Sequence, residues 1–197
     1  MKIIVCPMNW GWGHATRVIP VINKCLESGH EVVIGSSGTS AKLLKSEFPS
    51  LEHIKLPSNK VKYSWRNSQV FVLLLQLPFF LFSLIREHIY IKKINRKYHF
   101  DVIISDNRYG IRSPGAYNIF ITHQLNIIFP KSVKALSGIF HYIHHKLMDK
   151  FNEIWVPDDK SNLNVSGVLS DYLKKPGKII ESCILSRFSN SSVSKKN

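Results

Sequence analysis

The start of the chain switches between the pattern of a buried strand and the pattern of a helix. Residues 2–8 (KIIVCPM) form a short apolar run rich in β-branched side chains, which is typical of a strand buried on both faces. Apolar residues then recur at helical spacing, at Val18, Ile19, Ile22, Cys25 and Leu26. Gly29 fits a helix end, and residues 31–35 (EVVIG) form a second apolar run. Strand, helix and strand in this order indicate a parallel βαβ unit.

The rest of the chain repeats this alternation. We expect helices at 39–48 and 132–151, and strands at 53–56, 101–105, 118–122, 153–156 and 178–185. The pattern predicts an α/β fold, a Rossmann-like doubly wound parallel sheet. A length of 197 residues suits one such domain. We place its end at residue 188 and expect the polar tail 189–197 (SNSSVSKKN) to be disordered.

One apolar segment interrupts the alternation. Residues 70–85 (VFVLLLQLPFFLFSLI) carry almost no polar side chain, and basic residues precede and follow them. The run is shorter than the roughly 20 residues of a spanning helix, and it includes Gln76 and Pro78. Three interpretations stay open: a transmembrane span, a buried core helix, or a helix in the membrane interface with its basic flanks on anionic headgroups.

Charge and cysteine content narrow the classes of partner. The chain has 27 Lys and Arg against 13 Asp and Glu, a formal charge of +14, which favours an anionic partner. Only this positive charge supports a nucleic-acid partner, so we do not favour that interpretation. The three cysteines are scattered, and no secretory signal opens the chain. We therefore expect a reducing, cytoplasmic location, at the inner face of the membrane if the apolar segment is interfacial.

The loop after the first expected strand has the composition of an anion site. Gly11 and Gly13 allow close approach of backbone N–H groups, and the following helix start adds partial positive charge. His14 is a candidate general base or a helix cap, and Arg17 is either a phosphate ligand or a solvated arginine. Thr16 replaces the third glycine of a dinucleotide fingerprint, and no P-loop lysine follows. We expect no cofactor.

Two more polar loops follow expected strands, where parallel sheets bind ligands. One groups Asp106, Asn107 and Arg108, as a binding loop or a local Asp turn. The other contains His123, Gln124 and Asn126, as binding residues or a strand cap. The histidines His141, His144 and His145 have helical spacing but no carboxylate or cysteine beside them, so we expect no metal site.

Taken together, these loops resemble those of a known family. Residues 11–17 (GWGHATR), 105–110 (SDNRYG), 122–126 (THQLN) and 153–158 (EIWVPD) are similar to motifs in the N-terminal half of GT-B-fold glycosyltransferases, in the group of the peptidoglycan N-acetylglucosaminyltransferase MurG. The similarity covers residue 1 to about 188. Gln124 departs from the glutamate of that family.

The resemblance implies a function and roles. Such enzymes transfer sugar from a UDP-sugar to an acceptor, often a lipid-linked or saccharide precursor. Gly11, Gly13 and His14 would face the acceptor, with His14 as the base, and His123 and Asn126 would line the same cleft. The family's donor-binding C-terminal domain has no counterpart in these residues, so we expect a second domain or a partner chain to supply it. The alternative is a non-catalytic membrane-peripheral module that binds anionic lipid or polysaccharide precursors.

Overall fold

A computed structural model describes residues 1–57, 69–123, 125, 137–157 and 179–182. It contains one seven-stranded sheet, and every pairing in the sheet is parallel. The strands are β1 (Lys2–Pro7), β2 (Glu31–Ser36), β3 (Glu52–Lys55), β4 (Val102–Asp106), β5 (Tyr117–Ile121), β6 (Glu153–Pro157) and β7 (Ile179–Ser182). The helices are α1 (Gly11–Glu27), α2 (Gly38–Glu47), α3 (Gln69–Tyr98) and α4 (Ser137–Met148). The predicted fold class, a Rossmann-like parallel α/β sheet, is confirmed.

The order of the strands places two loops side by side at the middle of the sheet. The order is β3-β2-β1-β4-β5-β6-β7, so the chain builds outward from β1 in one direction and then returns to build in the other. Open parallel sheets bind ligands at such a reversal, beyond the carboxyl ends of the strands. Pro7 at the end of β1 pairs with Asp106 at the end of β4. The loops that follow these two strands therefore leave the sheet together.

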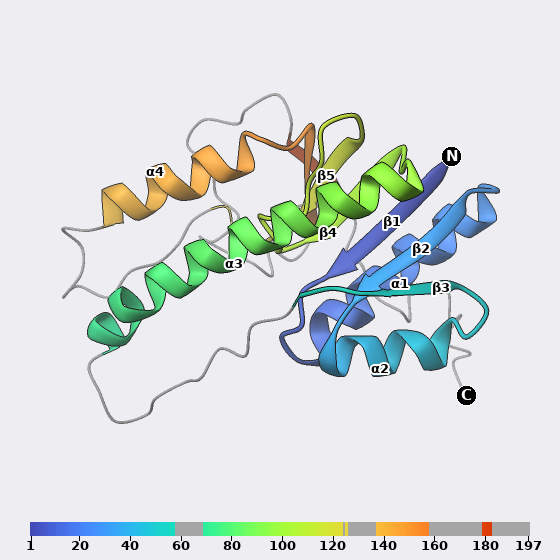
Figure 1. The fold of residues 1–197 in the computed structure, drawn as a ribbon, viewed down its shortest axis with the longest axis horizontal. Helices are drawn as coiled ribbons and strands as arrows, with labels where there is room; N and C mark the ends of the chain where they lie inside the picture. The colour runs from blue at the N-terminus through green and yellow to red at the C-terminus, as the bar shows by residue number, and fades with distance from the viewer. Residues whose placement is uncertain (58–68, 124, 126–136, 158–178, 183–197) are drawn as a thin grey trace, which may run out of the picture.

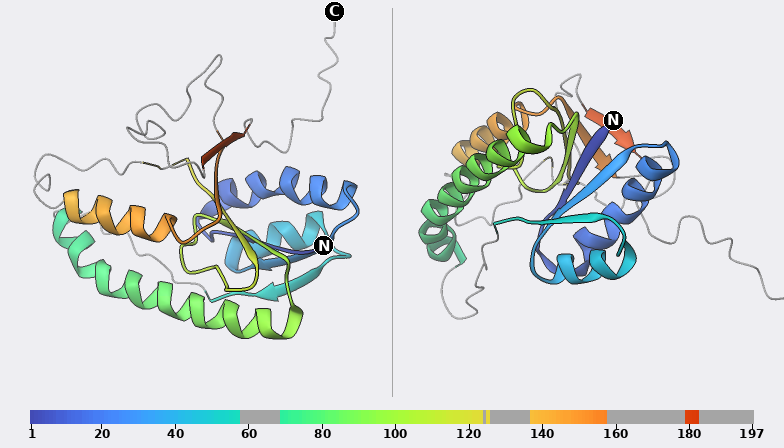
Figure 2. Two further views of the ribbon diagram at one scale, coloured as in Figure 1. Left: turned by 90° about the horizontal axis from the view of Figure 1, so that it is seen from above. Right: turned by 45° about the vertical axis from the view of Figure 1, so that its right-hand side comes forward.

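Helices cover both faces of the sheet (Figures 1 and 2). Alternate residues of β1 belong to different cores: Ile3 and Val5 pack with α1 and α2, whereas Ile4 and Cys6 pack with α3. Near the other edge, Phe120 and Ile154 pack with Met148 of α4, on the same face as α3. Because helices cover both faces of the sheet, the strands carry apolar side chains on both faces.

Helix α1 begins earlier than its apolar periodicity predicts. The periodic residues start after Ala15, yet the helix begins at Gly11. The four extra residues lie beyond the sheet edge, where no apolar core demands a periodic side chain, so the pattern cannot reveal them. The expected tail 189–197, and with it the domain end at residue 188, lies outside the described residues.

The apolar segment of the sequence forms the first half of α3, which differs sharply from the second half. The second half lies on the sheet, where Ile91 is completely buried. The first half of α3 and the start of α4 extend past the sheet, on the side of the strands' carboxyl ends (Figures 1 and 2). Phe79, Phe80, Leu81 and Phe82 are all exposed there. These residues do not fit a core helix, and among the described helices none is long and apolar enough to cross a bilayer.

A glycine lets α3 approach the loop after β4. A Cβ on Gly110 would lie 2.6 Å from the backbone oxygen of Leu84 and 2.7 Å from the Cβ of Glu87. Neither atom is the end of a flexible chain, so a side chain here would push the helix away from the loop.

We therefore predict that Gly110→Ala lowers the free energy of unfolding by about 1–3 kcal/mol, because it overpacks this contact. Denaturant titration followed by circular dichroism measures the change. Gly138→Ala in α4 is the matched control, since a Cβ there meets no atom within 4 Å. Equal stabilities of the two variants would contradict the close approach of α3.

Candidate active site

The centre of the site is a histidine bonded to a buried carboxylate. His14 lies in the first turn of α1, and its Nδ1 is 2.8 Å from Oδ2 of Asp106 at the end of β4. The Asp106 side chain is fully buried and that of His14 is 12% exposed. An ionised carboxylate only accepts hydrogen bonds, so in the neutral imidazole Nδ1 carries the hydrogen and Nε2 keeps its lone pair. His14 is thereby oriented to take a proton at Nε2.

Arg17 supplies the second bond to the same carboxylate. Its Nη1 donates to Oδ1 of Asp106 at 3.1 Å. Arg17 follows His14 by three residues on α1, so both side chains lie on one face of the helix. The sequence suggested that Arg17 contacts substrate. In the structure its guanidinium is paired with the buried carboxylate of Asp106, and 17% of the Arg17 side chain remains exposed.

The loop after β4 is fixed on both sides of Asp106. Asn107 has a φ of 58°, and its N–H donates to the carbonyl of Ile121 at the end of β5. The Thr122 hydroxyl donates to the side-chain oxygen of Asn107 at 3.0 Å. On the other side, the Ser105 hydroxyl donates to the carbonyl of Arg108 at 2.7 Å. The carboxylate is thus held in place before any ligand binds, a requirement for orienting a base.

Arg108 turns inward to α3. Its Nη2 donates to Oε1 of Glu87 at 2.7 Å and to the carbonyl of Pro57 at 2.5 Å, and both ionic groups are almost completely buried. Burial raises the pKa of Glu87, although the Arg108 charge opposes this change. The predicted contact of Arg108 with substrate stays a prediction. In the structure, Arg108 links the loop that carries Asp106 to Glu87 of α3.

The glycine loop is shaped by its own backbone and by α2. Gly11 has a φ of +70°, a conformation that other residues rarely adopt. Asn9 accepts hydrogen bonds from the backbone N–H and the hydroxyl of Thr39 in the first turn of α2. Gly38 permits this contact, because a Cβ there would overlap the Asn9 side chain. Sequence reasoning did not single out Asn9, and no pattern in the sequence links it to α2.

The third predicted loop is described only in part. His123 lies partly buried just after β5, next to the completely buried Thr122. Gln124 and Asn126 lie outside the described residues. Among the predicted site residues, the structure thus brings together His14, Arg17 and Asp106, and places Asn107 beside them as a support.

Other chemistries receive no support from the described part of the chain. No group of three His, Cys, Asp or Glu side chains in it is arranged to hold a metal ion. Cys6 lies one residue before Pro7 at the same sheet edge, but burial raises the pKa of its thiol to about 12. That thiol is therefore no nucleophile.

Comparisons with known proteins identify the fold. No protein-family model and no curated protein matches the sequence. Solved structures do match. The calicheamicin glycosyltransferase CalG4 matches with a TM-score of 0.56 at 11% identity, over 93% of this chain and 53% of its own. A UDP-glucosyltransferase from Polygonum tinctorium matches with a TM-score of 0.55 at 13% identity, over 93% and 52%. MurG of Acinetobacter baumannii is also matched, with a TM-score of 0.49 at 10% identity, over 81% and 41%.

The chain has the fold of the N-terminal half of a GT-B glycosyltransferase. The predicted resemblance is confirmed at the level of fold. The chain spans about half the length of the matched structures. The His14–Asp106 pair lies at the carboxyl edge of this sheet, the edge at which open parallel sheets in general bind ligands.

The buried pair of Arg108 and Glu87 makes a prediction about stability. Arg108→Leu leaves the Glu87 carboxylate buried without its cation, and we expect a loss of about 3–5 kcal/mol in the free energy of unfolding near pH 7. Removal of Arg108 also removes the charge that lowers the pKa of Glu87. Glu87 of the folded variant then binds a proton more readily than Glu87 of the unfolded chain. The loss in the free energy of unfolding therefore grows as the pH rises above 4.5, the ordinary pKa of glutamate.

Denaturant titrations at several pH values measure this dependence. Adding Glu87→Gln to Arg108→Leu is the matched control, because an amide cannot titrate and the extra pH dependence should vanish. A loss that is the same at all pH values, with or without Glu87→Gln, would contradict a buried ion pair.

Proposed function

We propose that this chain is the acceptor-binding half of a glycosyltransferase and supplies the base for sugar transfer from a UDP-sugar. The observation that carries the proposal is the His14–Asp106 pair, with a 2.8 Å contact, at the carboxyl edge of a GT-B half. The UDP-sugar is held by a second domain, on the same polypeptide or on a partner chain. The matched glycosyltransferases support this arrangement, since each is about twice as long as the part that aligns.

The proton transfer follows from the geometry. An acceptor hydroxyl donates its hydrogen to Nε2 of His14 as its oxygen attacks the anomeric carbon of the donor. The new carbon–oxygen bond forms while the bond to the diphosphate breaks, UDP leaves with the electron pair, and the configuration inverts. Asp106 stabilises the imidazolium that results, as a buried carboxylate does for a histidine base. The glycine loop and the exposed side of Arg17 are available to the acceptor, including any phosphate that it carries.

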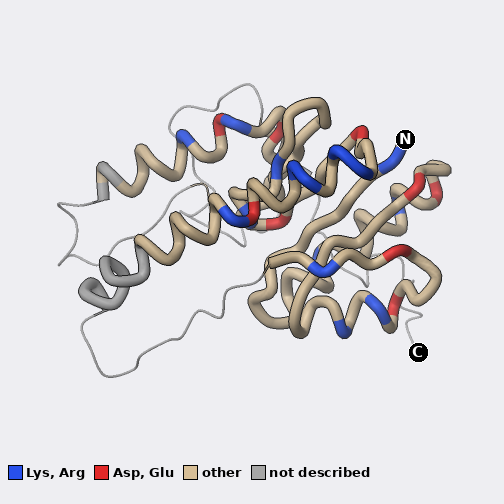
Figure 3. Tube along the Cα trace, viewed as in Figure 1, with Lys and Arg blue, Asp and Glu red and all other residues tan. Residues whose placement is uncertain are grey.

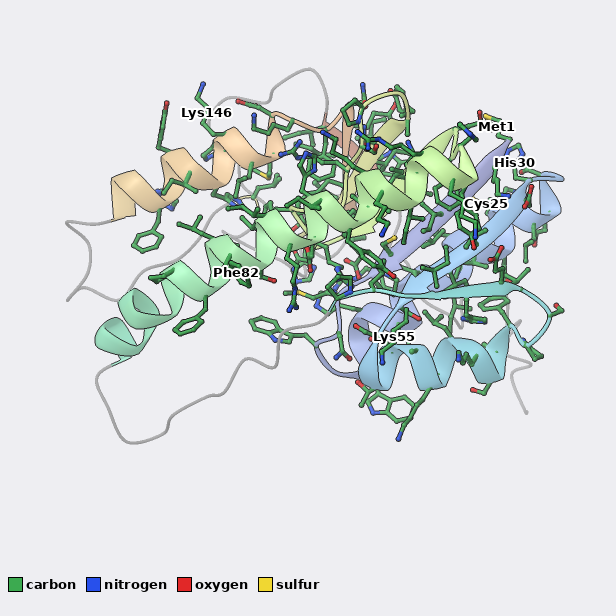
Figure 4. All side chains as sticks on the ribbon, in the orientation of Figure 1. Met1, Cys25, His30, Lys55, Phe82 and Lys146 are labelled. Carbon is green, nitrogen blue, oxygen red and sulfur yellow. The ribbon has the colours of Figure 1, made fainter. Side chains whose placement is uncertain are left out.

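A second proposal concerns the membrane. Phe79 and Phe82 of α3 are 72% and 63% exposed. Figure 4 shows Phe82 on the part of this helix that extends beyond the sheet. Basic side chains begin directly after this part, at Arg86, and continue along the second half of α3 (Figure 3). Exposed phenylalanines beside cations suit the interface of an anionic bilayer. Such a surface would bring a lipid-linked acceptor to His14, and by itself it equally suits the alternative of a non-catalytic membrane-peripheral module.

Loss of the base tests the catalytic proposal. We expect His14→Ala to lower the kcat of sugar transfer by about 10²-fold or more, because no group replaces the lost proton acceptor. The assay follows radiolabelled UDP-sugars into a lipid extract or into saccharides, with a lysate of the source organism present to supply a donor-binding partner. The purified chain alone should show no turnover.

Two further variants make the assay specific. Asp106→Asn should also lower kcat by about 10²-fold or more, since an amide can leave His14 in the wrong tautomer. His30→Ala, which changes a histidine in the turn between α1 and β2, is the matched control and should keep the wild-type rate. A wild-type kcat for His14→Ala would remove His14 from catalysis and favour the binding module.

Vesicle binding tests the membrane surface. We expect the chain to bind vesicles with anionic lipid better than neutral ones, and less at high salt. Phe79→Ser combined with Phe82→Ser should weaken the partition at least about tenfold, because two apolar side chains lose their insertion. Tyr117→Ser, at an exposed aromatic residue at the amino end of the inner strand β5, is the control. Sedimentation measures binding, and equal partition of all three proteins would contradict the proposal.

A further inference from the structure

Part of the loop after β4 lies along the second half of α3. At one end of this segment, Gly110 lies against the backbone of Leu84 in α3. At the other end, Nδ2 of Asn95 in α3 donates to the Ser113 hydroxyl at 3.2 Å. Arg112 belongs to the segment between these two contacts. It therefore lies beside the stretch of α3 that separates Leu84 from Asn95.

The residues of α3 next to Arg112 are themselves basic. His88 and Lys92 are four positions apart, so both side chains lie on one face of the helix. Burial lowers the pKa of His88, and the nearby charges of Arg112 and Lys92 lower it further, although contacts of its ring with the backbone of Arg112 and Gly110 act in the opposite direction. All three basic side chains are half-buried. Helix and loop thus bring three basic groups together.

This basic cluster lacks partners within the fold. Nε of Arg112 and Nδ1 of His88 are buried without a hydrogen-bond partner. In the part of the chain that the structure describes, no carboxylate forms an ion pair with Arg112 or Lys92, and Glu87, which precedes His88, is paired with Arg108. A buried N–H without an acceptor is costly, and an unmatched cation partly removed from water adds to that cost. An anion would relieve both costs.

We infer that Arg112, Lys92 and His88 form a binding site for a phosphate group on the side of α3. The planar fork of Arg112 would turn its Nε–H to one phosphate oxygen and an Nη–H to a second. Lys92 would supply a point charge, and Nδ1–H of His88 would donate to a further oxygen. Donors from three side chains suit the several oxygens of a tetrahedral phosphate better than the two oxygens of a carboxylate. The site does not include His14, so it does not depend on the proposed sugar transfer.

The phosphate has two possible sources, a lipid headgroup and a phosphate compound in solution. Ile85 and Ile89 of α3 are 59% and 63% exposed within one helical turn of His88, and they would adjoin the acyl chains of a lipid. The three basic side chains also keep part of their surface in water. A dissolved phosphate reaches them without a bilayer, and the test therefore has an arm for each source.

Titration of the full chain with inorganic phosphate tests the site. A ¹H–¹⁵N spectrum of protein with labelled arginine reports the Nε–H of Arg112, and Arg112→Lys identifies that signal by its loss. We expect phosphate to move the signal to saturation, and chloride at the same ionic strength to leave it in place. Lys92→Gln should weaken phosphate binding about threefold or more, because one of the cations is removed. Lys93→Gln is the matched control, since it removes the same charge from an exposed neighbour on α3.

Sedimentation with phosphatidylcholine vesicles, with and without phosphatidylglycerol, distinguishes the two sources. If Arg112→Gln and Lys92→Gln bind the phosphatidylglycerol vesicles less than Lys93→Gln does, the ligand is a lipid headgroup. If the three variants bind these vesicles equally while Lys92→Gln alone loses affinity for inorganic phosphate, the ligand is a phosphate in solution. The site would be rejected if chloride moved the Arg112 signal as far as phosphate does. Equal behaviour of Lys92→Gln and Lys93→Gln in both assays would reject it too.

Discussion

The structure of the site depends on one buried carboxylate. Asp106 ends β4 directly beside the end of β1, and it accepts one hydrogen bond from His14 and one from Arg17. A carboxylate without exposure to water is costly unless each oxygen is paired. Both of its partners come from α1, so the requirement to satisfy Asp106 fixes the rotation of that helix on the sheet. The same two bonds set the tautomer of His14, so that one interaction serves both folding and chemistry.

The loop that carries Asp106 also connects it to α3. Arg108, two residues further on, is paired with Glu87, and Gly110 lies against the backbone of the same helix. Helix α3 therefore reaches from the loop that carries Asp106 to the exposed phenylalanines beyond the sheet. An acceptor that binds to this apolar part of α3 would therefore contact a helix that is held, through Arg108 and Gly110, against the loop that carries Asp106. This continuity unites the proposed membrane surface and the proposed active site in one structural unit.

Much of the fold followed from the sequence because buried parallel strands and amphipathic helices have distinct periods. The strands at 31–35 and 101–105 were predicted within a residue of β2 and β4. The pairing of His14 with Asp106 was not predicted, although both were singled out, because it depends on β1 lying next to β4. The two strands are adjacent because the strand order reverses after β3, and the local composition of the sequence does not indicate this reversal. Glu87 was missed for a related reason: an acid beside an apolar run looks solvated until its buried arginine is known.

The central claim is that Asp106 holds His14 with the hydrogen on Nδ1 and the lone pair on Nε2. A long-range ¹H–¹⁵N NMR spectrum of protein with labelled histidine distinguishes the two nitrogens of each neutral ring directly. For the neutral ring the account predicts a single, Nδ1-protonated tautomer of His14, and a mixture of tautomers once Asp106 is replaced by alanine. A His14 ring protonated on Nε2, or one whose spectrum is unchanged in Asp106→Ala, would contradict it.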